Sequence, residues 1–344
     1  MNTKKKWTLK SVALHLGVSN ATVSNAFNRP DQLSKQRRND ILAACKELGY
    51  FGPNKAAQSL RRGTSNIVAL ILPDSVQYMV SDPVASSFIK GVAGVLEQHN
   101  VSLLLYSGSS DNLLDIVDFV DGFICYGNPR NSNIVEHLAQ INKKIVTVDF
   151  DLADCASVNI DNQQAAFDLT NQSLKTPTEH IAIFGLRLIE QDLVCRVYDQ
   201  NQLNAEKNSI AHKRLSGYLR AISQHGLAIN GERIWNIPES SSEFATMAAK
   251  EALSCSPRPE LIICMSDVIA IATIRQAQAQ GLKIPEDIRI VGFDGTQEGQ
   301  SLQPRLTTVH QNSVDKGIRA AELFLAKKRV KENIDYQILV GQSG

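Results

Sequence analysis

The chain has 344 residues, 43% of them hydrophobic, a size and composition that predict a large buried core and more than one domain. Its 36 Lys and Arg nearly balance its 35 Asp and Glu. No apolar run approaches membrane-spanning length, and no apolar stretch follows the Lys-rich N-terminus, which argues against a membrane anchor or a secretory signal. We therefore expect a cytoplasmic protein without a membrane partner.

The six cysteines are Cys45, Cys125, Cys155, Cys195, Cys255 and Cys264. They show no C-x-x-C spacing, and most of them lie in apolar runs. This pattern favours buried, reduced thiols over disulfides or a metal site. The sequence therefore predicts neither a metal nor another cofactor.

The charge is distributed very unevenly along the chain. Residues 1–63 contain twelve Lys and Arg against three Asp and Glu, a net charge of +9. The other 281 residues carry 24 basic against 32 acidic side chains, a net charge of −8. A basic head on an acidic body indicates a polyanionic partner for the head alone.

Two short helices are expected at the start of the head. Thr8 suits the N-cap of the first, whose apolar residues recur at helical spacing before Gly17 ends it. Ser19 suits the N-cap of the second, which buries Val23 and Phe27. Two helices joined by a glycine-containing turn predict a helix-turn-helix.

A third helix is expected from about residue 34 to residue 48, where Gly49 provides a stop. Ile41 and Cys45 would close the small core of the head. This pattern alone leaves two interpretations open, a DNA-binding unit and a three-helix domain with a solvated basic face.

The segment that follows, residues 53–63, bears on that choice. Asn54 can cap a helix of only about two turns, which is too short to persist in water without a partner. We expect this helix to fold on binding.

At these residues the chain resembles the LacI/GalR family of bacterial transcriptional regulators. The motifs are Thr22-Val23-Ser24 in the second helix, Leu48-Gly49-Tyr50 after the third, and Ala57-Gln58-Ser59-Leu60-Arg61 in the short segment. The resemblance implies a hinge helix over residues 53–63, with Leu60 wedged between base steps in the minor groove and Ala57 and Arg61 beside it. It implies base contacts from Asn20, Ala21 and Asn25, and phosphate contacts from Thr8, Ser19, Thr22, Ser24 and Asn28.

Beyond Gly63, short apolar runs alternate with amphipathic helical stretches. The expected strands are 66–72, 101–106, 122–126, 144–149, 157–160, 180–184, 233–237, 261–265 and 289–293. The expected helices between and after them are 85–99, 163–174, 213–225, 242–254, 267–280 and 313–327. This alternation predicts an α/β body of doubly wound parallel sheets.

Ligands of such sheets bind outside the carboxyl ends of the strands. The polar residues found there are Asp74, Ser75, Tyr78, Tyr126, Asn128, Asp149, Asp161, Ser266, Asp267 and Asp294. An Asp at a strand end can equally cap the next helix, so both interpretations stay open for each of them. The family resemblance extends over the body and implies that Asp161, Arg214, Ser266, Asp294 and the neighbouring Gln311 line an effector cleft between two lobes.

The resemblance also implies a domain plan. The head would span residues 1–52, the hinge helix 53–63 and the effector-binding and dimerisation body 64–340. The first lobe would comprise about 64–173 and 310–338, and the second about 174–309 and 339–344.

The sequence contains no phosphate-binding, nucleophile-elbow or zinc-protease motif, so we expect no enzyme. The expected function is a nucleoid-associated, DNA-binding transcriptional regulator, most simply a repressor, that binds palindromic operator DNA as a homodimer or tetramer. A sugar or nucleoside would control it, since carboxylates and arginine suit hydroxyl-rich ligands. The alternatives are a cytoplasmic sensor or solute-binding module without DNA activity, and a regulator that needs a corepressor.

Overall fold

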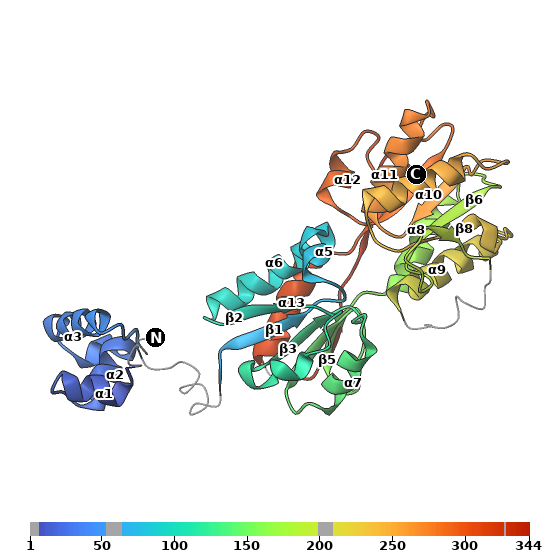
Figure 1. Ribbon diagram of the computed structural model, residues 1–344. Helices are drawn as coiled ribbons and strands as arrows, with labels where there is room; N and C mark the ends of the chain where they lie inside the picture. Colours follow the sequence, from blue (N-terminus) through green and yellow to red (C-terminus); the bar gives the residue numbers. More distant parts are fainter. Residues whose placement is uncertain (1–6, 53–63, 199–208, 327) are drawn as a thin grey trace. The chain divides into compact units, whose positions relative to one another are not determined.

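The structure is a computed structural model that describes residues 7–52, 64–198, 209–326 and 328–344. It divides into two compact units, a head that ends at Asn66 and a body that begins at Ile67 (Figure 1). The proposed hinge helix, with Ala57, Leu60 and Arg61, lies outside the described residues.

Three α-helices form the head within its described part: α1 (Leu9–His15), α2 (Asn20–Asn28) and α3 (Lys35–Glu47). The side chains of Thr8, Ser19 and Ser34 cap their N-termini, each accepting a hydrogen bond from a backbone N–H of the first turn. Gly17 and Gly49 follow the first and third helices with positive φ angles of 63° and 68°, which glycine adopts without strain. The predicted helix-turn-helix is confirmed.

The core of the head is small and apolar. Val12, Val23, Ala26 and Cys45 are fully buried there, and Tyr50 closes it from the segment after α3. Phe27, which we expected in this core, packs at its edge instead and is only half-buried.

The first sheet of the body has the strand order β12-β5-β4-β3-β1-β2, and its described pairs are all parallel. Its strands are β1 (Ile67–Ile71), β2 (Ser102–Tyr106), β3 (Gly122–Tyr126), β4 (Lys144–Val148), β5 (Ala156–Asn159) and β12 (Lys331–Asn333). Its helices are α5 (Val76–Ser81), α6 (Pro83–Gln98), α7 (Ser132–Gln140) and α13 (Ser313–Ala326). Figure 1 shows α6 and α13 side by side on this sheet.

The second sheet has the order β13-β11-β10-β9-β6-β8-β7; the outer strands β13 and β7 pair antiparallel, and the other described pairs are parallel. Its strands are β6 (Ile181–Leu186), β7 (Cys195–Arg196), β8 (Ile234–Ile237), β9 (Leu261–Cys264), β10 (Arg289–Asp294), β11 (Thr307–His310) and β13 (Gln337–Leu339). Its helices are α8 (Asn162–Ser173), α9 (Ile210–Gln224), α10 (Ser242–Leu253), α11 (Asp267–Ala279) and α12 (Gln297–Ser301).

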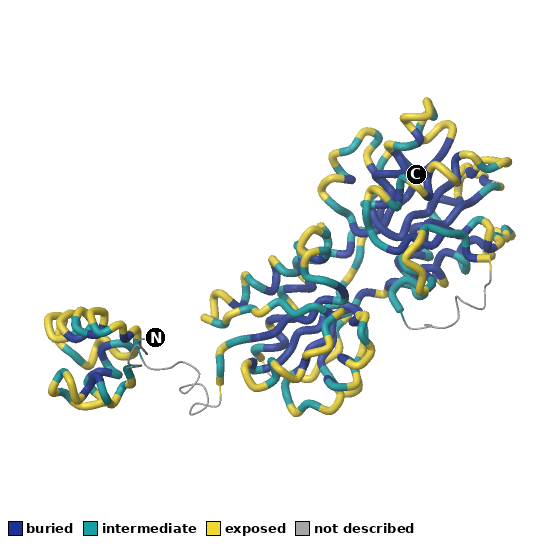
Figure 2. The backbone as a smooth tube through the Cα atoms, in the orientation of Figure 1, coloured by how far each residue is buried: buried dark blue, intermediate teal, exposed yellow. Residues whose placement is uncertain are grey.

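Each sheet carries an apolar core on both faces, which is the arrangement predicted from consecutive apolar residues. In Figure 2 the inner strands of both sheets, such as β1 and β10, are largely dark blue, and the exposed residues gather on outer helix faces and loops. The doubly wound parallel fold of both lobes is therefore confirmed.

Glycine permits close helix packing in the first lobe. A Cβ atom at Gly91 of α6 would collide with the carbonyl oxygen of Val314, and one at Gly317 of α13 would collide with that of Phe88. The two helix backbones therefore touch without intervening side chains.

The chain crosses between the lobes three times, near residues 160–161, 311–312 and 334–336. The first crossing differs from the predicted boundary after residue 173. Helix α8 packs against α9, and Ala165 and Leu169 lie in the core of the second lobe. The last crossing likewise precedes β13, which pairs with β11 of the second sheet.

Candidate functional site

Five of the candidate DNA-binding residues lie on one side of α2. Positions 20, 21, 24, 25 and 28 follow helical spacing, and the opposite side buries Val23 and Ala26. Asn20, Ala21 and Asn28 are exposed, while Ser24 and Asn25 are half-buried. The Nδ2 atom of Asn28 donates to the backbone oxygen of Ser24 at 3.1 Å. The face is thus polar and open, as base contact in a groove requires.

The hydroxyl groups assigned to phosphate contact also cap the helices. Ser19 Oγ accepts from Thr22 N at 3.0 Å and lies 2.8 Å from Thr22 Oγ1. Thr8 Oγ1 accepts from Ser11 N at 3.2 Å. Helix N-termini of this kind favour anions, so these positions suit a phosphate backbone.

In the body, Arg214 and Asp294 come together although 80 residues separate them in the sequence. Arg214 Nη1 lies 3.8 Å from Asp294 Oδ1 and donates to the backbone oxygen of Met265 at 2.7 Å. Its Nε donates to Asn162 Oδ1 at 2.9 Å, and its guanidinium lies 3.6 Å from the centre of the Phe293 ring. The arginine is 7% exposed, so these contacts fix its position.

Asp294 ends β10 with a φ of 131°, a conformation that is rare outside glycine. Gln311 Nε2 donates to Asp294 Oδ1 at 2.6 Å. Burial raises the pKa of Asp294 well above its ordinary value, Arg214 opposes that rise, and the Asp267 and Asp82 carboxylates add to it. Strain and a perturbed carboxyl in one place are typical of functional sites.

Lys316 of α13 links this cluster to the first lobe. It is fully buried, and its Nζ donates to Asp149 Oδ2 and to Gln311 Oε1, both at 2.7 Å. Burial lowers the pKa of Lys316, while Asp149 counteracts that shift. Asp149, Lys316, Gln311, Asp294, Arg214 and Asn162 therefore form one chain of polar contacts, which we call the polar relay. Two of its members lie at crossings between the lobes: Asn162 directly follows the first crossing, and Gln311 lies at the second.

Tyr126 lies at the carboxyl end of β3 beside this relay. Its ring stacks on Phe88, with 4.4 Å between the ring centres and 14° between the planes. Burial raises the pKa of Tyr126 well above its ordinary value, and the carboxylates of Asp149, Asp82 and Asp294 raise it further. The hydroxyl therefore stays protonated and can donate to a ligand.

Other candidate residues make contacts directly between the lobes. Asp74, at the end of β1, lies 3.1 Å from Arg187 Nη2 of the second lobe and 3.5 Å from Arg130 Nη1. Tyr78 accepts a hydrogen bond from Ser240 N at its hydroxyl at 2.9 Å. Ser240 Oγ in turn lies 2.7 Å from Ser266 Oγ.

The remaining candidates have structural roles or stand apart. Asp267 is buried and accepts from Thr296 and Thr308, so it fixes the loop after β10. Asp161 is exposed and caps α8 through Gln164 N, and its neighbour Asn162 binds Arg214 instead. Ser75 caps α5, and Asn128 is exposed and has no hydrogen bond to the relay among the described residues.

Sequence reasoning missed Asn162, Arg187, Ser240 and Lys316. The first three adjoin strand ends that the sequence did indicate, so a wider window would have included them. Lys316 lies inside an amphipathic helix, where a lysine is normally solvent-exposed, and no sequence signal marks it.

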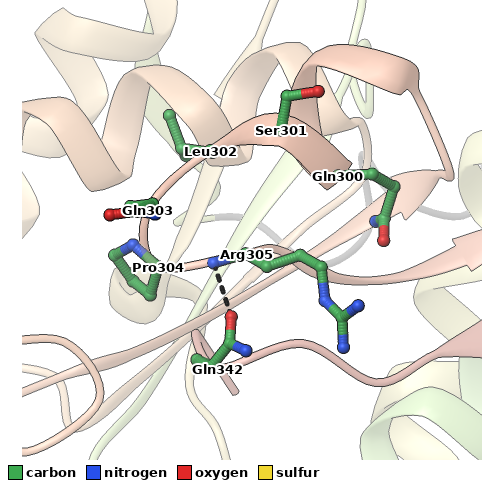
Figure 3. Close-up of a pocket in the computed structure, with 7 residues that line it drawn as sticks. All are labelled: Gln300, Ser301, Leu302, Gln303, Pro304, Arg305 and Gln342. Carbon is green, nitrogen blue, oxygen red and sulfur yellow. Dashed lines mark hydrogen bonds between the residues drawn. The ribbon is translucent and has the colours of Figure 1, made fainter.

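Two surface hollows lie away from the relay. One of about 420 Å³ is lined by the turn from Gln300 to Arg305 and by Gln342, whose Oε1 accepts from Arg305 N at 2.9 Å (Figure 3). A second of about 350 Å³ lies near His180 and Arg233. Neither contains a candidate effector residue.

Within the described ranges, no helix is long and apolar enough to cross a membrane. The same residues contain no group of three or more His, Cys, Asp or Glu that could hold a metal ion.

Comparison with known proteins identifies the family. Residues 8–54 match the bacterial regulatory proteins of the lacI family, and residues 193–342 match a periplasmic binding protein-like domain. The chain is 34% identical to the HTH-type transcriptional regulator Rv3575c of Mycobacterium tuberculosis, over 99% of this chain and 97% of that protein. The chain belongs to the lacI family.

Other lacI-family relatives agree with this. The HTH-type transcriptional repressor CytR of Escherichia coli strain K12 is 29% identical over 92% of this chain and 89% of its own length. A solved complex of the transcriptional regulator CelR with cellobiose covers 98% of this chain and 100% of its own, with a TM-score of 0.68 and 23% identity. A lacI-family regulator from Silicibacter pomeroyi covers 98% and 99%, with a TM-score of 0.77 and 24% identity. These two structures show the shared fold.

Membership of the lacI family makes this chain a DNA-binding transcriptional regulator and not an enzyme. Its head is the helix-turn-helix, and its body is the periplasmic-binding-protein-like effector domain.

Proposed function

We propose that the chain is a cytoplasmic repressor that binds a palindromic operator as a homodimer, and that a sugar or nucleoside bound between the lobes controls its operator affinity. The observation that carries this proposal is the polar relay. It places Arg214, Asp294 and Gln311 at the carboxyl ends of the second sheet and joins them to Asp149 and Lys316 of the first lobe.

The chemistry of these groups suits hydroxyl-rich ligands, because a carboxylate accepts and an arginine donates paired hydrogen bonds. The names of two relatives support a repressor and a sugar as ligand. CytR is named as a repressor, and CelR was solved with cellobiose. A corepressor, which would strengthen operator binding, remains the alternative.

A ligand changes operator affinity only if it binds two arrangements of the lobes unequally. Gln311 stands at the second crossing, and Asn162 begins α8 just after the first. A ligand that competes for Arg214 or Asp294 therefore alters contacts at the points where the lobes move relative to each other.

Dimerisation follows from the size of the head. One helix-turn-helix makes too few contacts for specific recognition, and two related by a two-fold axis match a palindromic site. Sedimentation of the full chain with and without operator DNA tests this assembly.

The effector assignment is tested with Arg214→Ala and Asp294→Ala. A genomic pull-down identifies the operator, and fluorescence anisotropy then measures its affinity with added sugars and nucleosides. Both variants should bind the ligand-free operator normally and lose the ligand response. Arg275→Ala is the control, since its 56% exposed side chain forms an ion pair with the surface residue Glu298. A normal response in both cleft variants would show that the effector binds elsewhere.

The DNA-binding assignment is tested with Leu60→Ala. Removing the wedge should weaken specific binding by more than about 1 kcal/mol, because the apolar contact that offsets base unstacking is lost. Ligand binding and dimerisation should not change. Unaltered operator affinity in a gel shift would exclude the wedge.

A further inference from the structure

Asp149 carries a carboxylate oxygen without a partner inside the candidate effector site. The residue is 6% exposed and ends β4 with a φ of 63°. Its Oδ2 accepts from Lys316, whereas Oδ1 is buried and has no hydrogen-bond partner among the described residues. A buried acceptor in that state is costly, so the site is incomplete until a donor reaches it.

Tyr126 lies at the same edge of the first sheet. Tyr126 ends β3, which pairs with β4 so that Tyr126 stands opposite Val148, the residue before Asp149. Asp149, Asp82 and Asp294 all lie close enough to its hydroxyl to raise its pKa beyond the effect of burial. The unpaired Asp149 Oδ1 and the Tyr126 hydroxyl therefore lie in a region whose electrostatic potential is set largely by carboxylates.

The cations of this region are already engaged. Lys316 binds Asp149 and Gln311. Arg214 binds Asn162 and the backbone of Met265 and faces Asp294. An incoming phosphate would have to displace Asp149 from Lys316 or Asp294 from Arg214. It would then meet the Asp149 carboxylate as a like charge, which is strongly unfavourable in a desolvated site.

We propose that this site takes ligands that carry O–H or N–H donors and no anionic group, with Asp149 Oδ1 accepting from the ligand, and that it rejects phosphate esters of the same compounds. The inference rests on the proposed function, because it assigns a ligand class to the same site. Since Oδ1 is enclosed in the present arrangement of the lobes, the ligand enters when the lobes move apart.

The test uses the full wild-type chain and matched pairs of compounds. The pairs are ribose and ribose 5-phosphate, glucose and glucose 6-phosphate, adenosine and adenosine 5′-monophosphate, and cytidine and cytidine 5′-monophosphate. Thermal shift finds the pairs that bind, and calorimetry measures both affinities. In each binding pair the parent compound should bind more than about tenfold tighter than its ester.

Asp149→Asn then probes the origin of the selection. Asn tolerates the positive φ and keeps an acceptor, but it removes one negative charge. The preference for the parent over the ester should fall by about tenfold in this variant. Asp151→Asn is the matched control, because Asp151 is exposed two residues away, and it should leave the preference unchanged.

The possible results separate the two proposals. An ester that binds as tightly as its parent overturns the charge selection, and operator release by that ester would leave the proposed effector control intact. If no compound from either half of the panel binds, the sugar or nucleoside assignment falls together with the selection. An unchanged preference in Asp149→Asn overturns the role of Asp149.

Discussion

Replacing Lys316 by Met is the most direct perturbation of the polar relay. Methionine keeps the length and apolar character of the fully buried side chain, but it removes both 2.7 Å hydrogen bonds from Nζ. Asp149 would then be a buried carboxylate without a hydrogen-bond partner among the described side chains. Breaking a buried ion pair in this way costs roughly 3–5 kcal/mol. For a domain of this size, that loss lowers Tm by roughly 6–20 °C.

Urea denaturation of the full chain, followed by circular dichroism, measures this loss. The double variant Lys316→Met/Asp149→Asn should recover at least half of it, because the uncompensated charge is gone. Arg275→Met provides the control, since it breaks an ion pair whose side chains are 56% and 61% exposed and should cost less than about 1 kcal/mol. A Lys316→Met protein within about 1 kcal/mol of wild type would refute the claim that this lysine neutralises a buried charge.

Two further predictions concern the first lobe and its contact with the second. Gly91→Ala should destabilise the body by about 1–3 kcal/mol, because the new methyl group collides with the backbone of α13, whereas Gly94→Ala in the same helix meets no atom and should stabilise it by about 0.5–1 kcal/mol. Equal denaturation midpoints for these two variants would contradict the close helix packing. Burial acts to raise the pKa of Asp74, but the Ser75 amide, Arg187 and Arg130 outweigh it, and the pKa falls below its ordinary value. The ionised Asp74 therefore stabilises the body above its ordinary pKa and loses that effect as pH falls through its lowered value, so the difference in Tm between wild type and Asp74→Asn should shrink from about pH 5 to pH 3. Asp118→Asn, at an exposed position in the same lobe, is the control variant.

The head was predictable because its structure is local. Thr8, Ser19 and Ser34 each bond to an N–H three residues away, so the caps are visible in any short window of sequence. For residues 53–63 the sequence predicts only a short helix that needs a partner, because two turns of helix do not persist alone in water, and the role as a hinge comes from the family resemblance.

The effector site was predictable only in part. Arg214 and Asp294 belong to motifs that resemble the family, and the structure brings them together. Lys316 and Asp149 were not paired in the prediction, since 167 residues separate them and only the packing of α13 joins them. The roles of the adjacent residues Asp161 and Asn162 could not be predicted from the sequence either. Both suit a strand end, and tertiary packing decides which one caps α8 and which one holds Arg214.

The three crossings between the lobes also bear on how the protein is made. The second lobe takes most of its sheet from one continuous stretch between residues 181 and 310. The first lobe lacks α13 and the edge strand β12 until residues 313–333 have left the ribosome. N-terminal domains generally fold first during synthesis, but this first lobe cannot complete its fold when its own N-terminal stretch has emerged. Until α13 emerges, Gly91 and the apolar face of α6 have no helix to cover them, and the nascent first lobe is the part of the body that needs protection from aggregation.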